Sequence, residues 1–125
     1  MKEMFEELYK AVKKDRNNSE FSRKHTMKAR LEEFQSEVNE IKKALENNDF
    51  ENLKEELGDA LWDLIFMIAI AEEQKIFTGK EVINNVIEKF KRRKPWIFNG
   101  EKLDVEEEVR RWDKTKEIEK ENKVI

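Results

Sequence analysis

The sequence predicts an all-α protein, a bundle of four to five helices around an antiparallel central pair. Charged residues make up 44% of the 125 residues and hydrophobic residues 38%, with only three glycines and one proline. A sheet protein would need more turn residues and more β-branched runs. The apolar residues recur at spacings of three and four, which is typical of amphipathic helices. One core, and therefore a single domain over residues 1–125, suits a chain of this length.

Five helical segments follow one another along the chain. Their expected ranges are residues 2–14, 23–46, 50–74, 78–94 and 105–120. Asp49 is a suitable N-cap for the third helix and Thr78 for the fourth. Pro95 disfavours helix at the residue before it and so ends the fourth. The segment "PWIFNGEKLD" that follows is expected to be a loop.

Composition narrows the possible functions. The net charge is −3, from 26 basic and 29 acidic residues, so no overall field favours nucleic acid or a membrane as a partner. The chain has no cysteine, which excludes disulfides and thiolate metal sites and fits a cytoplasmic location. The apolar run at residues 60–71 is too short to span a bilayer and is expected to be a buried core helix.

Four carboxylates are spaced so that two neighbouring helices would bring them together. Glu37 and Glu40 lie three residues apart on one flank of the second helix, and Glu56 and Asp59 lie on the same-handed flank of the third. The short connection around Asn48 makes these helices antiparallel, with their apolar faces together. Glu40 and Glu56 are each eight residues from Asn48, and Glu37 and Asp59 are each eleven. The spacing predicts one acidic cluster at two levels.

Three further acids, Glu33, Glu55 and Asp63, lie close enough along the same helices to surround this cluster. The alternative interpretation is a set of ordinary solvated acids, which are common on a chain with 29 acidic residues. The mirrored heights and the apolar segment from Ala60 onward favour the cluster.

Carboxylates held together in a partly dry site raise one another's pKa. A hard divalent cation removes the repulsion between the carboxylates that causes this pKa shift. An all-oxygen ligand set selects Mg²⁺, or Mn²⁺ as a substitute, over Zn²⁺. Protein-bound Mg²⁺ is usually shared with substrate phosphates, so the pattern points to a nucleotide. Gly58 in mid-helix costs about 1 kcal/mol relative to alanine. It indicates either tight helix packing or the close approach of another backbone.

These motifs resemble those of the MazG family of all-α nucleoside triphosphate pyrophosphohydrolases. "EELGD" (Glu55–Asp59) matches the family's second acidic motif, and "SEVNE" matches the first except at Ser36, where many members have glutamate. "HTMKARLEEF" is similar to the family's entry segment, although the tryptophan-containing element that often precedes it is absent. "EKFKRRKPWIF" and "RRWDKTKEIEK" resemble the basic and C-terminal motifs. The likeness covers nearly the whole chain after the first twenty residues.

The resemblance implies a Mg²⁺-dependent hydrolase that converts a nucleoside triphosphate to its monophosphate and pyrophosphate. The implied metal ligands are four acids: Glu37, Glu40, Glu56 and Asp59. In such a reaction a glutamate of the cluster, Glu37 or Glu55, is expected to take the proton of the attacking water. The implied substrate contacts come from the last two helices: Lys89 and Arg93 on the triphosphate, and Trp112 and Lys116 over the nucleotide.

The residues themselves leave other interpretations open for the substrate contacts. Lys89 and Arg93 share a helix face, as a phosphate clamp requires, but cations at a helix C-terminus also interact favourably with the helix dipole. Trp112, one turn from Lys116, is equally suited to stack on a base or to pack between helices. His25 is expected at the surface or as a cap rather than as a ligand.

A homodimer, or a pair of dimers, is also expected. The third helix is apolar around most of its circumference, more than one small layer of helices can cover. Trp62 and Phe66 lie on its side opposite the acids and are expected in the core or at a dimer interface. The resembled family also forms dimers.

Two other functions stay open at this point. A narrower all-α pyrophosphatase for dUTP or dCTP shares the acidic motifs, although Trp112 and Lys116 favour the MazG type. A charged helical binding module would use "KRRK" and the last helix to bind a protein or a nucleic-acid backbone without turnover, but the organised acids weigh against it. The favoured interpretation is a cytoplasmic enzyme that acts on small nucleotides.

Overall fold

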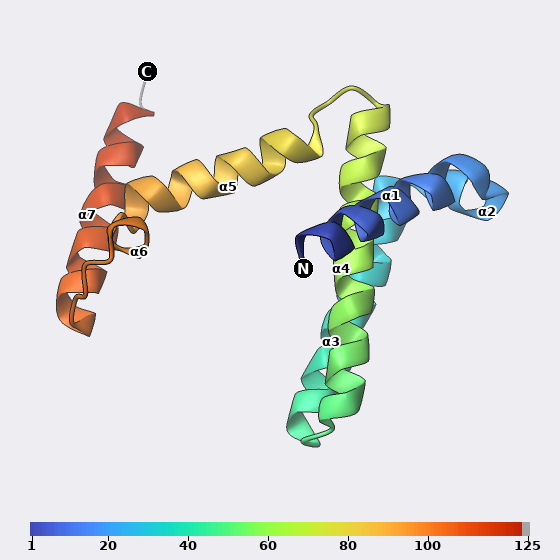
Figure 1. Ribbon diagram of the computed structural model, residues 1–125, viewed down its shortest axis with the longest axis horizontal. Coiled ribbons are helices and arrows are strands. Elements are labelled where there is room, and N and C mark those ends of the chain that lie inside the picture. The colour runs from blue at the N-terminus through green and yellow to red at the C-terminus, as the bar shows by residue number, and fades with distance from the viewer. Residues whose placement is uncertain (124–125) are drawn as a thin grey trace. The chain divides into compact units, whose positions relative to one another are not determined.

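The described part of the chain, residues 1–123, folds into helices only, as the sequence predicts. The computed structural model has five long helices and two of four residues each (Figure 1). In order they are α1 (Lys2–Asn18), α2 (Glu20–Arg23), α3 (Met27–Glu46), α4 (Phe50–Glu73), α5 (Gly79–Arg93), α6 (Trp96–Asn99) and α7 (Val105–Asn122). None of these helices is both long enough and apolar enough to cross a membrane.

The helices belong to two compact units, which are described separately. The first unit is Met1–Gly79 and contains α1 to α4, and the second begins at Lys80. The expectation of a single domain over residues 1–125 stays a prediction.

Side-chain caps determine where several helices begin. Ser19, Thr26, Asp49 and Asp104 each accept a hydrogen bond from the backbone N–H three residues later, in the first turn of α2, α3, α4 and α7. Such a cap satisfies one of the N–H groups that a helix start leaves without a partner, and it contributes about 1 kcal/mol. The predicted cap at Asp49 is confirmed.

The second predicted helix, residues 23–46, is wrong at its start. A corner at residues 24–26 separates α2 from α3. Arg16 of α1 holds this corner, because its guanidinium donates to the carbonyl oxygens of Ser22 at 2.6 Å and His25 at 2.8 Å. The guanidinium is buried, so this contact comes from tertiary structure and leaves no trace in local periodicity.

The core of the first unit lies where α1 packs against the second half of α4. Val12, Phe66 and Ile70 are completely buried there, and Trp62 packs against them with part of its surface exposed. Burying a side chain of this size stabilises the fold by about 1.5–3 kcal/mol. Phe66 is therefore a core residue of this chain and is not available to line a dimer interface.

Helices α3 and α4 form an antiparallel hairpin around a tight turn at residues 47–49 (Figure 1). Two contacts between the helices define the register: Arg30 bonds to Asp63 at 3.0 Å, and carboxylate oxygens of Glu37 and Glu56 lie within 4.8 Å of each other. The prediction of an antiparallel central pair is confirmed.

The faces that meet in this hairpin differ from the predicted ones. The acid-bearing flank of α4, with Ala60 and Asp63 buried, faces α3. Six aliphatic residues that were expected between the helices instead remain 38–53% exposed: Leu31, Val38 and Leu45 on α3, and Leu57, Leu61 and Leu64 on α4. On each helix, these exposed residues are rotated in the same direction away from the residues that contact the other helix. Because a local two-fold axis relates an antiparallel helix pair, both sets lie on one side of the hairpin. We call these six residues the aliphatic seam.

The junction between α4 and α5 is fixed to α1. Glu72 accepts hydrogen bonds from the Tyr9 hydroxyl at 2.5 Å and from the Gly79 N–H at 2.9 Å. Helix α5 begins at Gly79, directly after Thr78, as predicted. A Cβ atom on Gly79 would lie 2.9 Å from the Tyr9 hydroxyl oxygen and 3.3 Å from Cγ2 of Ile68. An alanine at Gly79, the last residue of the first unit, would therefore require the Tyr9 side chain to shift.

The second unit contains α5, α6 and α7. Trp96 is buried, and its indole N–H donates to Glu108 of α7 at 3.3 Å. This anchor draws residues 96–99 into a helical turn, so the loop predicted for this segment is wrong there. Gly100 ends the turn in the left-handed conformation (φ 78°), which glycine adopts without strain.

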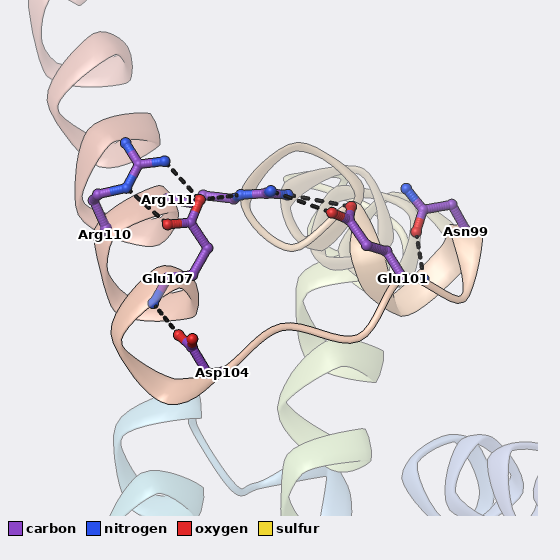
Figure 2. Close-up of polar contacts among 6 residues, drawn as sticks. All are labelled: Asn99, Glu101, Asp104, Glu107, Arg110 and Arg111. Atoms are coloured by element: carbon purple, nitrogen blue, oxygen red, sulfur yellow. Dashed lines mark hydrogen bonds and ion pairs between the residues drawn. The ribbon is translucent and has the colours of Figure 1, made fainter.

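Figure 2 shows how the start of α7 is held. Asp104 accepts from the Glu107 N–H at 2.9 Å, and the Glu107 carboxylate accepts from Arg110 and Arg111. Arg111 also reaches back to Glu101 at 3.2 Å. Hydrogen bonds from Arg110 and Arg111 hold the pKa of Glu107 at about 2. These contacts order the connection between α6 and α7.

The Gly79 junction yields a stability prediction. Gly79→Ala should lower the free energy of unfolding by about 1–3 kcal/mol, the usual cost of overpacking, measured by urea denaturation. Removing the hydroxyl oxygen in Tyr9→Phe removes the closest clash, so the alanine should cost less in that background. Equal costs in both backgrounds would contradict the close approach as the cause.

Candidate functional site

The first candidate site is an acidic cluster between α3 and α4. Glu37 lies on the face of α3 that meets α4, one heptad after Arg30 and one before Ala44, both of which are buried. Glu56 and Asp59 lie one turn apart on α4. One carboxylate oxygen from each of Glu37, Glu56 and Asp59 lies within 4.8 Å of the others. The hairpin register therefore brings together three of the four acids predicted from spacing.

A hydrogen bond to Glu56, partial burial and the negative charges of Glu56, Asp59 and Asp63 raise the pKa of Glu37 to about 7. Like charges this close cannot all ionise without a large repulsion. The cluster therefore holds a proton at a pH where an ordinary glutamate has lost it.

The donor set of the cluster fits a hard divalent cation. The Oε2 atom of Glu37 is buried and meets no hydrogen-bond donor within residues 1–123. Leaving such an acceptor without a partner costs about 1–3 kcal/mol. A cation would satisfy this oxygen and neutralise the three carboxylates. Oxygen-only ligands suit Mg²⁺ and Mn²⁺ rather than Zn²⁺.

A buried ion pair between Arg30 and Asp63 lies beside the acidic cluster, one turn of α4 beyond Asp59. Arg30 donates to Asp63 at 3.0 Å, contacts the ring nitrogen Nδ1 of His25 at 2.7 Å, and lies 3.8 Å above the centre of the Phe66 ring. Burial raises the pKa of Asp63, while the hydrogen bond and positive charge of Arg30 oppose that shift. Asp63 is thus held in an ion pair, and Arg30 joins the hydrophobic core to the acids.

The other predicted residues of α3 and α4 lie outside the three-acid group. Glu40 pairs with Lys43 at 3.5 Å, and Glu55 is exposed. Gly58 is exposed as well, and a Cβ atom there would meet no atom within 4 Å. The interpretation of Gly58 as a site of tight packing within the chain is therefore wrong.

The predicted substrate contacts lie in the second unit, around the ring of Trp112. Arg93 lies 5.2 Å and Lys116 6.0 Å from the ring centre, and Phe90 packs against the ring at 5.8 Å. Lys89, one turn before Arg93, is exposed. The second unit thus places Arg93 of α5 and Lys116 of α7 beside the ring of Trp112.

The chain matches a known family over most of its length. A family model described as the MazG nucleotide pyrophosphohydrolase domain matches residues 22–98. The chain belongs to the MazG family. The matched segment includes the acidic cluster, Lys89 and Arg93, and it ends before Trp112 and Lys116.

Individual relatives agree with this assignment. A nucleoside triphosphate pyrophosphohydrolase/pyrophosphatase MazG from Thermotoga maritima is 35% identical over 97 residues, which are 76% of this chain and 38% of that protein. A nucleoside triphosphate pyrophosphohydrolase from Mycobacterium tuberculosis is 32% identical over 91 residues, 71% of this chain and 28% of that protein. The chain thus spans 38% and 28% of the lengths of these two relatives.

A solved structure covers nearly all of the chain. The crystal structure of a MazG-related protein from Thermotoga maritima superposes with a TM-score of 0.85 and 31% sequence identity. The alignment covers 90% of this chain and 98% of that one. The all-α MazG fold expected from the sequence is confirmed.

Two polar residues of the chain were missed from the sequence. Arg30 lies seven residues before Glu37, so the heptad spacing places it on the same helix face and was an available signal. Glu119 lies three residues after Lys116 and seven after Trp112, on the face of α7 that carries both. Its carboxylate binds Arg92 and Arg93.

The raised pKa of Glu37 gives a pH-dependent prediction for the metal-free protein. In the unfolded chain Glu37 ionises near 4.5, whereas in the fold its pKa is about 7. Its contribution to stability is therefore fully present below pH 4.5 and is lost as the pH rises through about 7. Glu37→Gln mimics the protonated form, so the free energy of unfolding of the variant should rise relative to wild type across this range. Urea denaturation in chelator at several pH values measures it.

Glu46→Gln, at the exposed end of the same helix, is the matched control and should show a pH-independent difference. A pH-independent difference for Glu37→Gln as well would contradict the raised pKa.

Proposed function

We propose that this protein is a Mg²⁺-dependent hydrolase that cleaves a nucleoside triphosphate between the α- and β-phosphates. The products are the nucleoside monophosphate and pyrophosphate. The observation that carries the proposal is the oxygen-only cluster of Glu37, Glu56 and Asp59 within a MazG domain. The names of the relatives, nucleoside triphosphate pyrophosphohydrolases, support the reaction. Because nucleoside triphosphates are cytoplasmic metabolites, the proposal includes a cytoplasmic location.

Glu37, Glu56 and Asp59 would hold the Mg²⁺, or Mn²⁺ as a substitute, and Glu40 would join them after release from Lys43. When bound, the cation supplies neutralisation of the phosphate charge and an acidified water. The two cluster levels predicted from spacing would then both contribute ligands. The buried, unpartnered oxygen of Glu37 supports this assignment.

The remaining residues would position the substrate and move one proton. Water attacks the α-phosphorus and loses its proton to Glu37 or Glu55, while the bond to the bridging oxygen breaks and pyrophosphate leaves. Lys89 and Arg93 would neutralise the charge that develops on this leaving group. A second group of contacts would cover the nucleoside: Trp112 and Lys116.

We also propose that a second copy of this chain covers the aliphatic seam. The six exposed residues are spaced along one side of the hairpin, where a second hairpin would complete a four-helix bundle. Isolated apolar residues are common on surfaces, but a row this long on one side indicates an interface. The homodimer predicted from the sequence thus remains part of the proposal. Its proposed interface is the aliphatic seam instead of Trp62 and Phe66. Two such dimers could associate further into a tetramer, which the proposal includes.

The reaction is tested by pyrophosphate release from a panel of nucleoside triphosphates, with and without Mg²⁺. Glu56→Gln removes a proposed ligand with little change in shape, so Mg²⁺-dependent release should fall by at least about 100-fold. Glu51→Gln, an exposed acid of the same helix that pairs with Lys54 at 2.9 Å, should retain the wild-type rate. An unchanged rate in Glu56→Gln would dispose of the metal assignment.

The dimer is tested by sedimentation at micromolar concentration. The wild-type chain should sediment at twice its mass of 15.2 kDa, or as a multiple of that dimer. Leu57→Glu should give the monomer, because it places a charge in the seam. Val109→Glu is the matched control, since Leu57 and Val109 are both 52% exposed and Val109 lies outside the seam. A monomeric wild-type protein would contradict the proposal.

A further inference from the structure

We infer that Arg92 and Arg93 form a two-guanidinium anion site, which Glu119 fills in the substrate-free protein and a phosphate group of the substrate takes over. Arg92 thereby becomes a phosphate-binding residue beside Arg93, and Glu119 becomes an internal competitor of the substrate. The identity of the displacing ligand rests on the proposed function, whereas the anion site itself rests on geometry.

The two guanidinium groups converge on one carboxylate. The Oε1 atom of Glu119 accepts from Nε and Nη2 of Arg92 at 3.0 and 2.7 Å, and from Nε of Arg93 at 3.2 Å. The Oε2 atom accepts from Nε of Arg93 at 2.9 Å. Arginine forks of this kind match the oxygens of carboxylates and phosphates alike.

The charges in this site are unequal. Two cations share a single carboxylate, so one positive charge remains uncompensated within the three-residue group. Hydrogen bonds from Arg92 and then Arg93 lower the pKa of Glu119, which keeps the carboxylate ionised. A phosphate group carries more negative charge and more acceptor oxygens than a carboxylate. It can therefore compensate both arginines better than Glu119 does.

The surroundings keep Arg93 in place when the carboxylate leaves. The Arg93 side chain is only 18% exposed, and its guanidinium lies 5.2 Å from the centre of the Trp112 ring.

The position of Glu119 along α7 links it to the proposed nucleotide contacts. Trp112, Lys116 and Glu119 follow at spacings of four and three residues, so they share one face of the helix. A competitor on this face would weaken the binding of every anion that must displace it by the same factor. Glu119 would thus weaken the binding of the product as well as of the substrate and assist product release.

The test is the binding of inorganic tripolyphosphate to the full chain in chelator, measured by calorimetry. Glu119→Gln removes the competing charge but keeps the size of the side chain, and it should bind tripolyphosphate about 3- to 10-fold more tightly than wild type. The same variant should lower KM for a nucleoside triphosphate. Glu117→Gln removes the same charge from an exposed site on the same helix and should change affinity less than about twofold.

A second variant isolates the role of Arg92. In the Glu119→Gln background, Arg92→Gln should remove the gain in tripolyphosphate affinity, because one of the two guanidinium groups is lost. If circular dichroism shows that Glu119→Gln has lost its fold, Glu119→Asp replaces it. The shorter side chain retracts the carboxylate, and its tripolyphosphate affinity should exceed that of wild type by at least about twofold.

Other results overturn the inference. If Glu119 only clamps α7 to α5, its removal lowers the melting temperature and leaves tripolyphosphate affinity unchanged or weaker. An equal gain in Glu117→Gln would show a general charge effect in place of a site. Tight tripolyphosphate binding by Glu119→Gln in a protein that hydrolyses no nucleoside triphosphate would retain the anion site and reject the proposed function.

Discussion

The approach of three carboxylates across the α3–α4 hairpin is the constraint on which the rest of the structure depends. Glu37, Glu56 and Asp59 bring oxygens within 4.8 Å of one another, a distance at which ionised groups repel strongly. Packing must hold the helices together against this repulsion. The core of α1 and α4 supplies that packing, and Arg30 connects it to the acids through Asp63 and the Phe66 ring.

The two units carry complementary chemistry. The first unit concentrates acids, with a raised pKa at Glu37 and a buried oxygen that lacks a donor. The second concentrates cations around Trp112 and neutralises some of them internally with Glu119. In the first unit the repulsion among the carboxylates is reduced by a proton, and in the second unit Glu119 partly neutralises the arginines. A bound metal would replace that proton, and a bound phosphate would replace Glu119.

Much of the fold was accessible from the sequence because its signals are local. The period of the apolar residues, the cap at Asp49 and the break before Pro95 predicted the long helices, and antiparallel spacing predicted that Glu37 would meet Glu56 and Asp59. The rotation of the hairpin was not accessible. The period of the apolar residues identifies an apolar stripe on a helix but not the surface that covers it. The aliphatic seam was therefore expected to lie between α3 and α4, whereas it is exposed on one side of the hairpin.

The other errors have similar causes. The corner before α3 depends on the buried Arg16, and the turn of α6 depends on the buried Trp96, both of which are tertiary contacts. Gly58 was interpreted from its helix propensity alone, and the space beside it is open. The pairing of Glu119 with Arg92 and Arg93 was missed because the sequence motifs identified cations without their partners.

Direct binding of Mn²⁺, followed by the loss of its free-ion signal in electron paramagnetic resonance, tests the metal assignment most directly. At neutral pH the wild-type protein should bind the ion without any nucleotide present. Asp59→Asn, which removes a charge from the exposed edge of the cluster, should weaken that binding by at least about tenfold. Equal Mn²⁺ affinity in wild type and Asp59→Asn, or no binding by the wild-type chain, would contradict the assignment of Glu37, Glu56 and Asp59 as a metal centre.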